Sequence, residues 1–370
     1  MTSTVLNRPE TAPKTPINFE TYPPVAPAKL RLDHFDKMLT DIGIWQHSAG
    51  PQPDRRHGYS IDDQVRGLIV AINYFQAGVE TKFMERLGRV CFDFVKNAAI
   101  TSGPNAGRFH NFCDEHYHWL DKIGSDDSLG RTIWALGVAC SADVPFAPRE
   151  EAMPLLSRAM RVAEKLSPAR TVAFSILGTP TDHSELVGNL ADRLVLSFRD
   201  SATDDWAWFE NHLTYCNARL PQALFAAADR FPERPEYLAV ARRSLAFLLR
   251  VSQNEKGSYS PIGNEPLTSR GWYTRGDERP PLFDQQPVDA GALVECCALA
   301  YAVTGNPTYR HAAHSAYGWY FGANVHGISV YHPDHGGVAD AITPSGISDN
   351  MGAESVISIH LAHQALSAIG

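Results

Sequence analysis

Amphipathic helical segments recur in pairs along almost the whole chain of 370 residues, and this repetition limits the possible folds more than any other feature. In the pair 62–76 and 81–97, apolar residues recur at i, i+3, i+4 and i+7, the spacing of one helix face. The same spacing predicts ten further helices, over residues 30–42, 126–141, 150–166, 168–177, 184–198, 217–228, 235–253, 288–303, 307–321 and 350–368.

The helices that open each pair differ in composition from their partners. They begin near residues 62, 126, 168, 217, 288 and 350, and they are richer in Ala, Gly and Cys. Small side chains suit the close packing of an inner ring. Twelve helices in alternation therefore predict an all-α (α/α)6 toroid of six inner and six outer helices. An irregular all-α bundle is the alternative.

Composition sets the expected domain organisation and surroundings. Residues 1–28 contain six prolines, which predicts a disordered or surface-draped leader before a single α/α-toroid catalytic domain over 29–370. Without a signal-peptide pattern or a run of 18 apolar residues, we expect no membrane contact. Six cysteines without a C-x-x-C pair predict free thiols and a cytoplasmic location. A net charge of -8 argues against a nucleic-acid partner.

Five of the six inner helices begin with carboxylates, amides or aromatic residues. The segments are GYSIDD (58–63), GSDD (124–127), DDWAWFENHLTYCNARL (204–220), FDQQPVD (283–289) and SDNMGAES (348–355). Helix capping explains one acid per helix, but not the tryptophans and the paired glutamines. Because inner N-termini gather at one end of a toroid, these side chains form one cluster. Indoles that stack on sugar rings, beside polar groups that bind hydroxyls, predict a carbohydrate site.

The acid and base of this site are predicted from their neighbours. Glu210 is the candidate general acid, since Trp206 and Trp208 flank it and an apolar wall favours a protonated carboxyl. Asp63 and Asp127 are the candidates for the general base, because helix N-termini favour ionised carboxylates. An inverting glycosidase needs such a pair about 6.5–9.5 Å apart, with water between them. For each residue, a capping or surface role is the alternative.

The remaining candidates are expected to bind the substrate. They are His57, Asp62, Arg66, Arg131, Trp206, Trp208, Asn217, Trp272, Asp284, Gln285, Gln286, Asp289, Asn350 and Glu354. Arg66 and Arg131 lie one helical turn after Asp63 and Asp127, so ordinary ion pairs within a helix are the alternative there. The run HPDH at 332–335 provides two possible metal ligands but no identifiable third. We therefore expect no metal and no cofactor.

Several of these strings together resemble the helical toroid region of bacterial proteins described as glycosyltransferases, in which that region often follows a nucleotide-sugar transferase domain. The strings are HGYSIDDQVRGLI (57–69), GRFHNF (107–112), GSDDSLGRTIWALG (124–137), WAWFENHLTYCNARLPQAL (206–224), FDQQPVDAGAL (283–293) and NMGAESVIS (350–358). The resemblance covers about residues 30–365 and implies the architecture of the six-hairpin glycosidases. Two features depart from it: Cys216 stands where the family commonly has an acid, and these 370 residues contain no transferase domain.

The leading functional prediction is a carbohydrate-active enzyme, an inverting glycoside hydrolase that acts on an oligosaccharide or polysaccharide. One alternative is a non-catalytic sugar-binding or partner module of a glycosyltransferase system. The other is a sugar epimerase or isomerase that uses histidine. The expected partner is a carbohydrate substrate, with a functional link to a separate glycosyltransferase.

Overall fold

The computed structural model describes residues 29–255, 257–264 and 271–370. The leader expected over 1–28 lies outside the described residues. The helices are α1 (Asp33–Met38), α2 (Ile61–Gln76), α3 (Thr81–Ala98), α4 (Asp126–Ser141), α5 (Arg149–Ala163), α6 (Ala169–Gly178), α7 (Ser184–Ser201), α8 (Arg219–Arg230), α9 (Pro235–Val251), α10 (Pro287–Thr304), α11 (Pro307–Gly318) and α12 (Ala353–Ser367).

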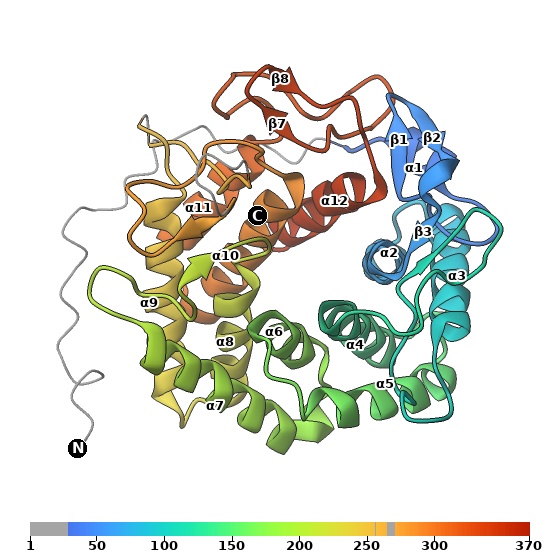
Figure 1. Ribbon diagram of the computed structural model, residues 1–370, viewed down its shortest axis with the longest axis horizontal. Coiled ribbons are helices and arrows are strands. Elements are labelled where there is room, and N and C mark those ends of the chain that lie inside the picture. The colour runs from blue at the N-terminus through green and yellow to red at the C-terminus, as the bar shows by residue number, and fades with distance from the viewer. Residues whose placement is uncertain (1–28, 256, 265–270) are drawn as a thin grey trace.

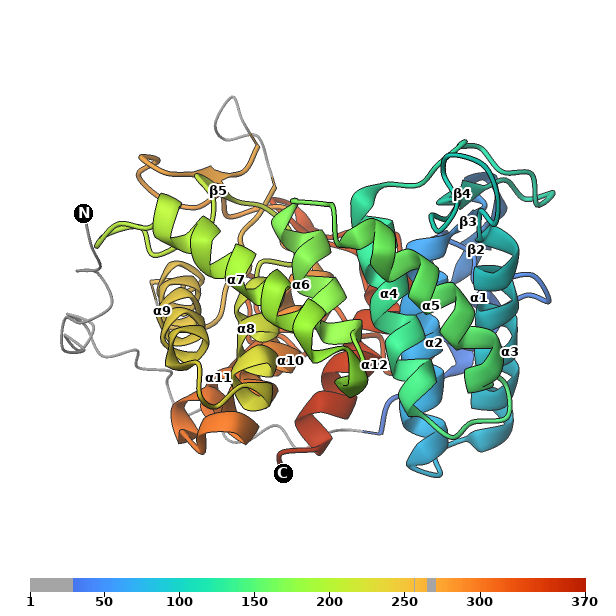
Figure 2. The same cartoon turned by 90° about the horizontal axis from the view of Figure 1, so that it is seen from below.

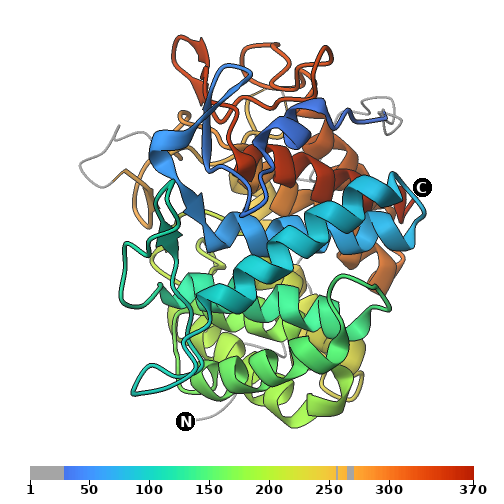
Figure 3. The ribbon, with the colours of Figure 1, turned by 90° about the vertical axis from the view of Figure 1, so that its right-hand side faces the viewer.

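The even-numbered helices form a closed inner ring. Each of α2, α4, α6, α8, α10 and α12 packs on the next, and α12 packs on α2 (Figure 1). The odd-numbered helices from α3 to α11 lie outside this ring, and Figure 3 shows α3 in front of α2. The predicted (α/α)6 toroid is confirmed.

Small residues let the inner helices approach one another closely. A Cβ added to Gly137 of α4 would lie 1.7 Å from the carbonyl oxygen of Gly178 at the end of α6. A Cβ on Gly130 would lie 3.0 Å from Cα of Thr171, again between α4 and α6. Neither glycine has an unusual φ, so the need is for space between the helices rather than for backbone freedom.

Several predicted helices are shorter than expected, and two of these differences lie near the candidate site. The first helix is only α1 and not 30–42, because Leu39 and Ile44 pair in an antiparallel bridge soon after it. The last helix begins at Ala353 rather than at 350, because the residues before it are hydrogen-bonded to residues 46–50. Both changes bring loop residues to the N-terminal end of the inner ring.

Four short antiparallel pairs brace the loops that precede the inner helices. Figure 2 shows β3, β4 and β5 at the same end of the molecule. They are β1 (His47–Ala49) with β2 (Gln52–Asp54), β3 (Tyr59–Ser60) with β4 (Phe112–Cys113), β5 (His212–Leu213) with β6 (Tyr273–Thr274), and β7 (Ile342–Thr343) with β8 (Gly346–Ile347). The second pair ties the loop before α4 to the start of α2. The third ties the loop before α8 to the loop before α10, so the inner N-termini share one braced rim.

The helix α10 is long and apolar enough to cross a membrane, judged by length and composition alone. In the folded chain α10 is a member of the inner ring, and 61% of its 18 residues are buried. Cys296 and Cys297, both fully buried, lie on it. These properties are those of a core helix.

Candidate active site

Arginines on successive inner helices join each helix to its neighbour at the rim. Arg66 of α2 donates to Glu354 of α12 at 2.8 Å and to Asp63 of its own helix at 3.1 Å. Arg131 of α4 lies 3.2 Å from Asp62 of α2. These contacts join acids of α2 and α12 to arginines of α2 and α4.

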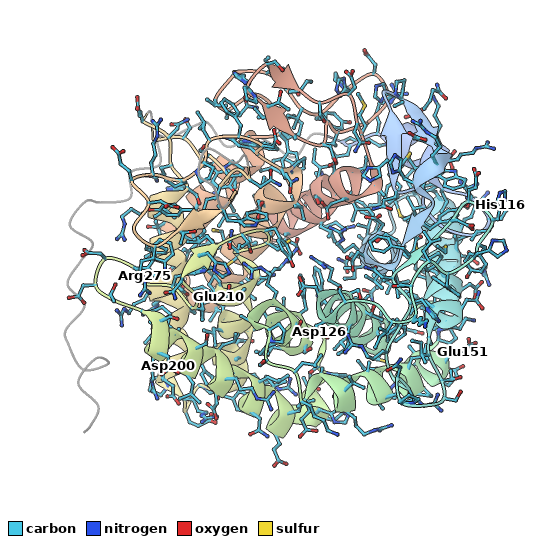
Figure 4. All side chains as sticks on the ribbon, in the orientation of Figure 1. His116, Asp126, Glu151, Asp200, Glu210 and Arg275 are labelled. Carbon is cyan, nitrogen blue, oxygen red and sulfur yellow. The ribbon has the colours of Figure 1, made fainter. Side chains whose placement is uncertain are left out.

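The network continues through α6 and α8. Arg170 of α6 donates to Glu210 at 3.0 Å, to Asn217 Oδ1 at 3.1 Å and to the Tyr215 carbonyl at 2.7 Å. The Tyr215 hydroxyl donates to Asp127 of α4, which connects this group to Arg131. The predicted acids thus lie at one end of the toroid. Figure 4 shows Glu210 on the inner margin of the ring and Glu151 on its outer side.

Asp63 and Glu354 share the Arg66 guanidinium but differ in burial. The Asp63 side chain is 4% exposed, and burial raises its pKa to about 8 although Arg66 opposes the shift. The Glu354 side chain is 43% exposed. Burial also opposes ionisation of Glu354, but Arg66 and Arg131 together outweigh it, and its pKa lies below the ordinary value. The expectation that its helix N-terminus keeps Asp63 ionised is therefore wrong.

Asp289, in the first turn of α10, is a second buried acid beside Glu354. Burial raises its pKa to about 7, although the Cys216 amide donates to its Oδ1 at 2.7 Å. The negative charge of Glu354 adds to this rise. Cys216 has φ +48°, a left-handed conformation that L residues rarely adopt, and its amide is the donor to Asp289. Residue 216, where the resembled family commonly has an acid, thus binds Asp289 through its backbone amide.

Glu210 does not have the environment predicted for a general acid. Its carboxylate accepts a hydrogen bond from Arg170, and its side chain is 25% exposed. The indole of Trp206 donates to the Glu210 backbone carbonyl and not to its carboxylate. The prediction failed because residues adjacent in sequence direct their side chains to different neighbours.

Trp206 and Trp208 are core residues, and their predicted role in sugar stacking is wrong. Trp208 is fully buried, and Trp206 packs edge-on against Phe247 of α9 with ring centroids 5.1 Å apart. Trp272 is half-buried at the rim, 6.2 Å from the ring of Tyr215. An aromatic surface is therefore present, but it is formed by Trp272 and Tyr215.

Three predicted amide ligands are used inside the protein. Gln285 is fully buried and bonds to Ser260 and the Trp319 indole. Asn217 accepts from Arg170 and from the Thr214 amide, and its own amide donates to the Thr214 carbonyl. The Asn350 amide is also occupied on both sides, as described below. Gln285 and Asn217 are buried in these contacts, so the direct contact with substrate predicted for them is wrong. Asn350 is partly exposed, and its contact with substrate stays a prediction.

The other predicted ligands lie around the same rim. Asp62 and Asp127 are partly exposed, at 21% and 16% of their side chains. His57 is half exposed and lies 3.7 Å from Asp54. Asp284 and Gln286 are half-buried in the approach to α10.

Four contributors were missed by the sequence prediction: Arg170, Tyr215, His47 and Asp340. Arg170 follows Pro168 at the start of α6, an inner helix whose first turn contains no acid. Its position at an inner N-terminus was the available signal. His47 lies in β1 and Asp340 in the loop before β7, outside every predicted helix, and only the folded chain brings them to α12.

A narrow cavity lies between the inner helices within the ring. Its lining includes Arg66, Arg131, Cys216, Arg219 and Glu295. Arg219 of α8 donates to Glu295 of α10 and stacks 4.6 Å over the ring of Trp134. Paired arginines therefore line the cavity inside the ring as well as the rim. Among the described residues, no group of three or more His, Cys, Asp or Glu residues is placed to hold a metal ion.

Comparison by sequence gives no relatives: no protein-family model matches the chain, and no curated protein matches it. Solved structures do match. A cellobiose 2-epimerase from Bacillus thermoamylovorans B4167 has a TM-score of 0.69 at 10% identity, over 92% of this chain and 96% of the epimerase. A D-mannose isomerase has a TM-score of 0.67 at 12% identity, over 91% and 95%.

Glycoside hydrolases match as well. The family GH76 α-mannanase from Bacteroides thetaiotaomicron has a TM-score of 0.58 at 11% identity, over 91% of this chain and 93% of the mannanase. At such low identity the likeness establishes the fold alone. The chain has an (α/α)6 toroid fold, which it shares with a solved sugar epimerase, a sugar isomerase and a glycoside hydrolase.

Proposed function

We propose that this chain is a carbohydrate-active enzyme that hydrolyses a glycosidic bond with inversion, at the rim where the inner helices begin. One observation carries the proposal. Glu354, an accessible carboxylate with a lowered pKa, lies beside two buried carboxyl groups whose pKa values are raised to about 8 and about 7. Carboxyl groups whose environments separate their pKa values are the usual basis of acid–base catalysis on sugars.

The environments suggest the role of each group. Glu354 is ionised and open to solvent, so it serves as the general base that activates water. Asp289, near neutrality in pKa and 9% exposed at the start of α10, serves as the proton donor. Asp63 is too buried to touch a sugar and acts with Arg66 to orient Glu354. This assignment replaces Glu210 as the acid.

The neighbouring side chains provide a surface for the sugar. Trp272 and Tyr215 offer the aromatic faces, and Tyr215 is itself fixed by cation–π contacts with Arg170 at 5.0 Å and Arg131 at 5.8 Å. Asp62 and Asp127 offer partly exposed carboxylate oxygens for hydroxyl groups. Both are held by Arg131, so their geometry is set before a sugar binds.

Epimerisation or isomerisation of a free sugar is the second candidate. The structural likeness to a cellobiose 2-epimerase and a D-mannose isomerase favours it, as does a histidine, His47, beside Glu354. A sugar-binding partner of a separate glycosyltransferase is the third. The free, buried cysteines support a cytoplasmic location for any of these.

One experiment separates the three candidates. The protein is incubated in deuterated water with cellobiose, D-mannose and α-mannan oligosaccharides, and the products are followed by NMR. New reducing ends that first appear as the inverted anomer support the proposal. Deuterium at a sugar carbon without bond cleavage would replace hydrolysis by epimerisation. If one of these sugars binds but none is turned over, the result would favour the non-catalytic sugar-binding module.

A further inference from the structure

The loop that contains β1 is fastened to the start of α12. The Ala353 amide donates to the Gln46 carbonyl at 3.1 Å, and the Gly50 amide donates to the Asp349 carbonyl at 2.9 Å. Gly352, the N-cap of α12, has no room for a side chain, since a Cβ there would lie 2.6 Å from the Gln46 oxygen. Residue 47 is therefore held at a fixed place beside Glu354.

The amide of Asn350 is fully engaged, and its orientation is determined by its partners. Its Oδ1 accepts from the Ser48 backbone amide at 2.9 Å, which requires the oxygen on that side. Its Nδ2 donates to the Asp340 carboxylate at 2.9 Å and lies 2.8 Å from Nδ1 of His47. The Ser355 hydroxyl donates to the other oxygen of Asp340 and holds the carboxylate in place. Both hydrogens of the Asn350 amide are thus assigned.

This orientation fixes the proton of the His47 imidazole. Because Asn350 Nδ2 is a donor, Nδ1 of His47 must be the acceptor and carries no hydrogen. The neutral ring therefore carries its proton on Nε2. Within the described part of the chain, Nε2 of His47 has no hydrogen-bond partner. This nitrogen is not one of the buried unpaired atoms, and His47 is only partly buried.

His47 also has the right neighbours for a role at the site. Its ring packs edge-on against His57 at 4.6 Å, and it lies close enough to Glu354 and Asp340 to affect both electrostatically. Asn350 thus connects a buried carboxylate to an imidazole whose second nitrogen is free. A free donor next to an accessible carboxylate forms a pair that can bind a hydroxyl group from two sides.

We infer that His47 is a further substrate-contacting residue, whose Nε2–H donates to a sugar oxygen at Glu354, and that Asp340 and Asn350 are positioning residues that hold it in this tautomer. The inference rests on the proposed function for the identity of the ligand. The tautomer itself does not depend on that function, and this makes the two separable by experiment.

The first test reads the proton position directly. Nitrogen-15 NMR of the full chain at pH 7.5 distinguishes the two neutral tautomers of a histidine, and the His47→Gln variant assigns the signal. We expect hydrogen on Nε2 and a bare Nδ1. Hydrogen on Nδ1 would overturn the inference whether or not the protein acts on sugars.

The second test uses the sugar that the parent binds or turns over among cellobiose, D-mannose and α-mannan oligosaccharides. We expect His47→Ala to weaken that sugar's binding or raise KM about tenfold with a smaller change in kcat, since one neutral hydrogen bond is lost. His47→Gln, which restores an amide donor near Nε2, should recover most of this loss. Asn350→Ala should also raise KM, because nothing then fixes the tautomer.

The matched control is His335→Ala. His335 is also half-buried and its Nδ1 also accepts a hydrogen bond, from the Gly337 amide at 3.1 Å, but its ring packs against His34 and His332, with ring centroids 5.6 and 5.4 Å apart. It should leave KM within about twofold. If His47→Ala matches this control, or if Gln fails to rescue it, the inference is wrong. If no sugar in the panel is bound or cleaved while the tautomer is as expected, it is the proposed function that fails.

Discussion

Two sides of the rim both contain an arginine paired with carboxylates, but the number of carboxylates that the arginine faces differs. On the α12 and α2 side, Arg66 faces two carboxylates, Asp63 and Glu354. On the α6 and α8 side, Arg170 faces one carboxylate, Glu210, together with an amide oxygen and a backbone carbonyl. On the first side burial raises the pKa of Asp63 to about 8, although Arg66 opposes the shift.

This difference is the reason for proposing that the α12 and α2 side is the reactive one. Glu354 combines ionisation with a side chain 43% exposed, while its buried neighbours Asp63 and Asp289 keep protons near neutral pH. Arg170 uses its donors to hold the loop before α8. Acid, arginine and aromatic residues occur on both sides, so residue type alone does not identify the reactive one.

The largest expected effect is at Glu354. Replacing it with Gln keeps the shape and removes the base, so kcat on a cleaved substrate should fall about 10²–10⁴-fold. Circular dichroism and the melting temperature should show a folded protein. A variant that retains full turnover would move the reactive centre away from the α12 side.

The next effect concerns pH and Asp289. Hydrolysis requires this carboxyl to hold its proton, so kcat/KM should fall as pH rises through about 7. In Asp289→Asn the proton donor is absent, so activity should be low and this alkaline limb should disappear. The measurement is a pH profile of both proteins between pH 5 and 9. A limb unchanged in the variant would show that another group is the donor.

The third contrast is between the two kinds of tryptophan. Trp208 is fully buried, so Trp208→Ala should lower the free energy of unfolding by about 3–5 kcal/mol. Trp272→Ala should change stability little and weaken sugar binding instead, because its ring is half-buried at the rim. Urea unfolding and calorimetric titration measure the two effects. Equal destabilisation by both changes would remove Trp272 from the site.

A fourth test concerns the stability of the α2 side. Burial raises the pKa of Asp63 from 3.8 to about 8, so the folded state binds this proton more tightly than the unfolded state. The resulting stabilisation is complete below about pH 3.8, falls as pH rises, and is lost above about pH 8. Asp63→Asn should reduce this decline. Unfolding free energies at pH 5, 7 and 9 measure it, and parallel curves would refute the raised pKa.

The smallest effect is expected at Glu210. Glu210→Gln keeps a group that accepts from Arg170, so turnover should fall less than about tenfold. Direct comparison with Glu354→Gln under the same conditions tests the contrast between the two sides. A loss at Glu210 as large as that at Glu354 would reverse the assignment.

The fold was predictable from the sequence because helix periodicity is local. The helix predicted over 126–141 matches α4 at both ends, and the six inner helices form the predicted ring. Failures occur where long-range contacts compete with local preference. The residues at 350–352 continue the pattern of α12, yet they are held outside the helix by the β1 loop.

The sequence by itself determined that acids, arginines and aromatic residues gather at one end of an α/α toroid, because alternating helices place every inner N-terminus on the same side. Only the tertiary structure decided which of them is exposed, paired or protonated. Burial and pairing depend on neighbours from other helices, as with Arg66, which reaches 288 residues along the chain to Glu354. The charge state of a carboxyl depends on these neighbours, so the local sequence pattern does not predict it.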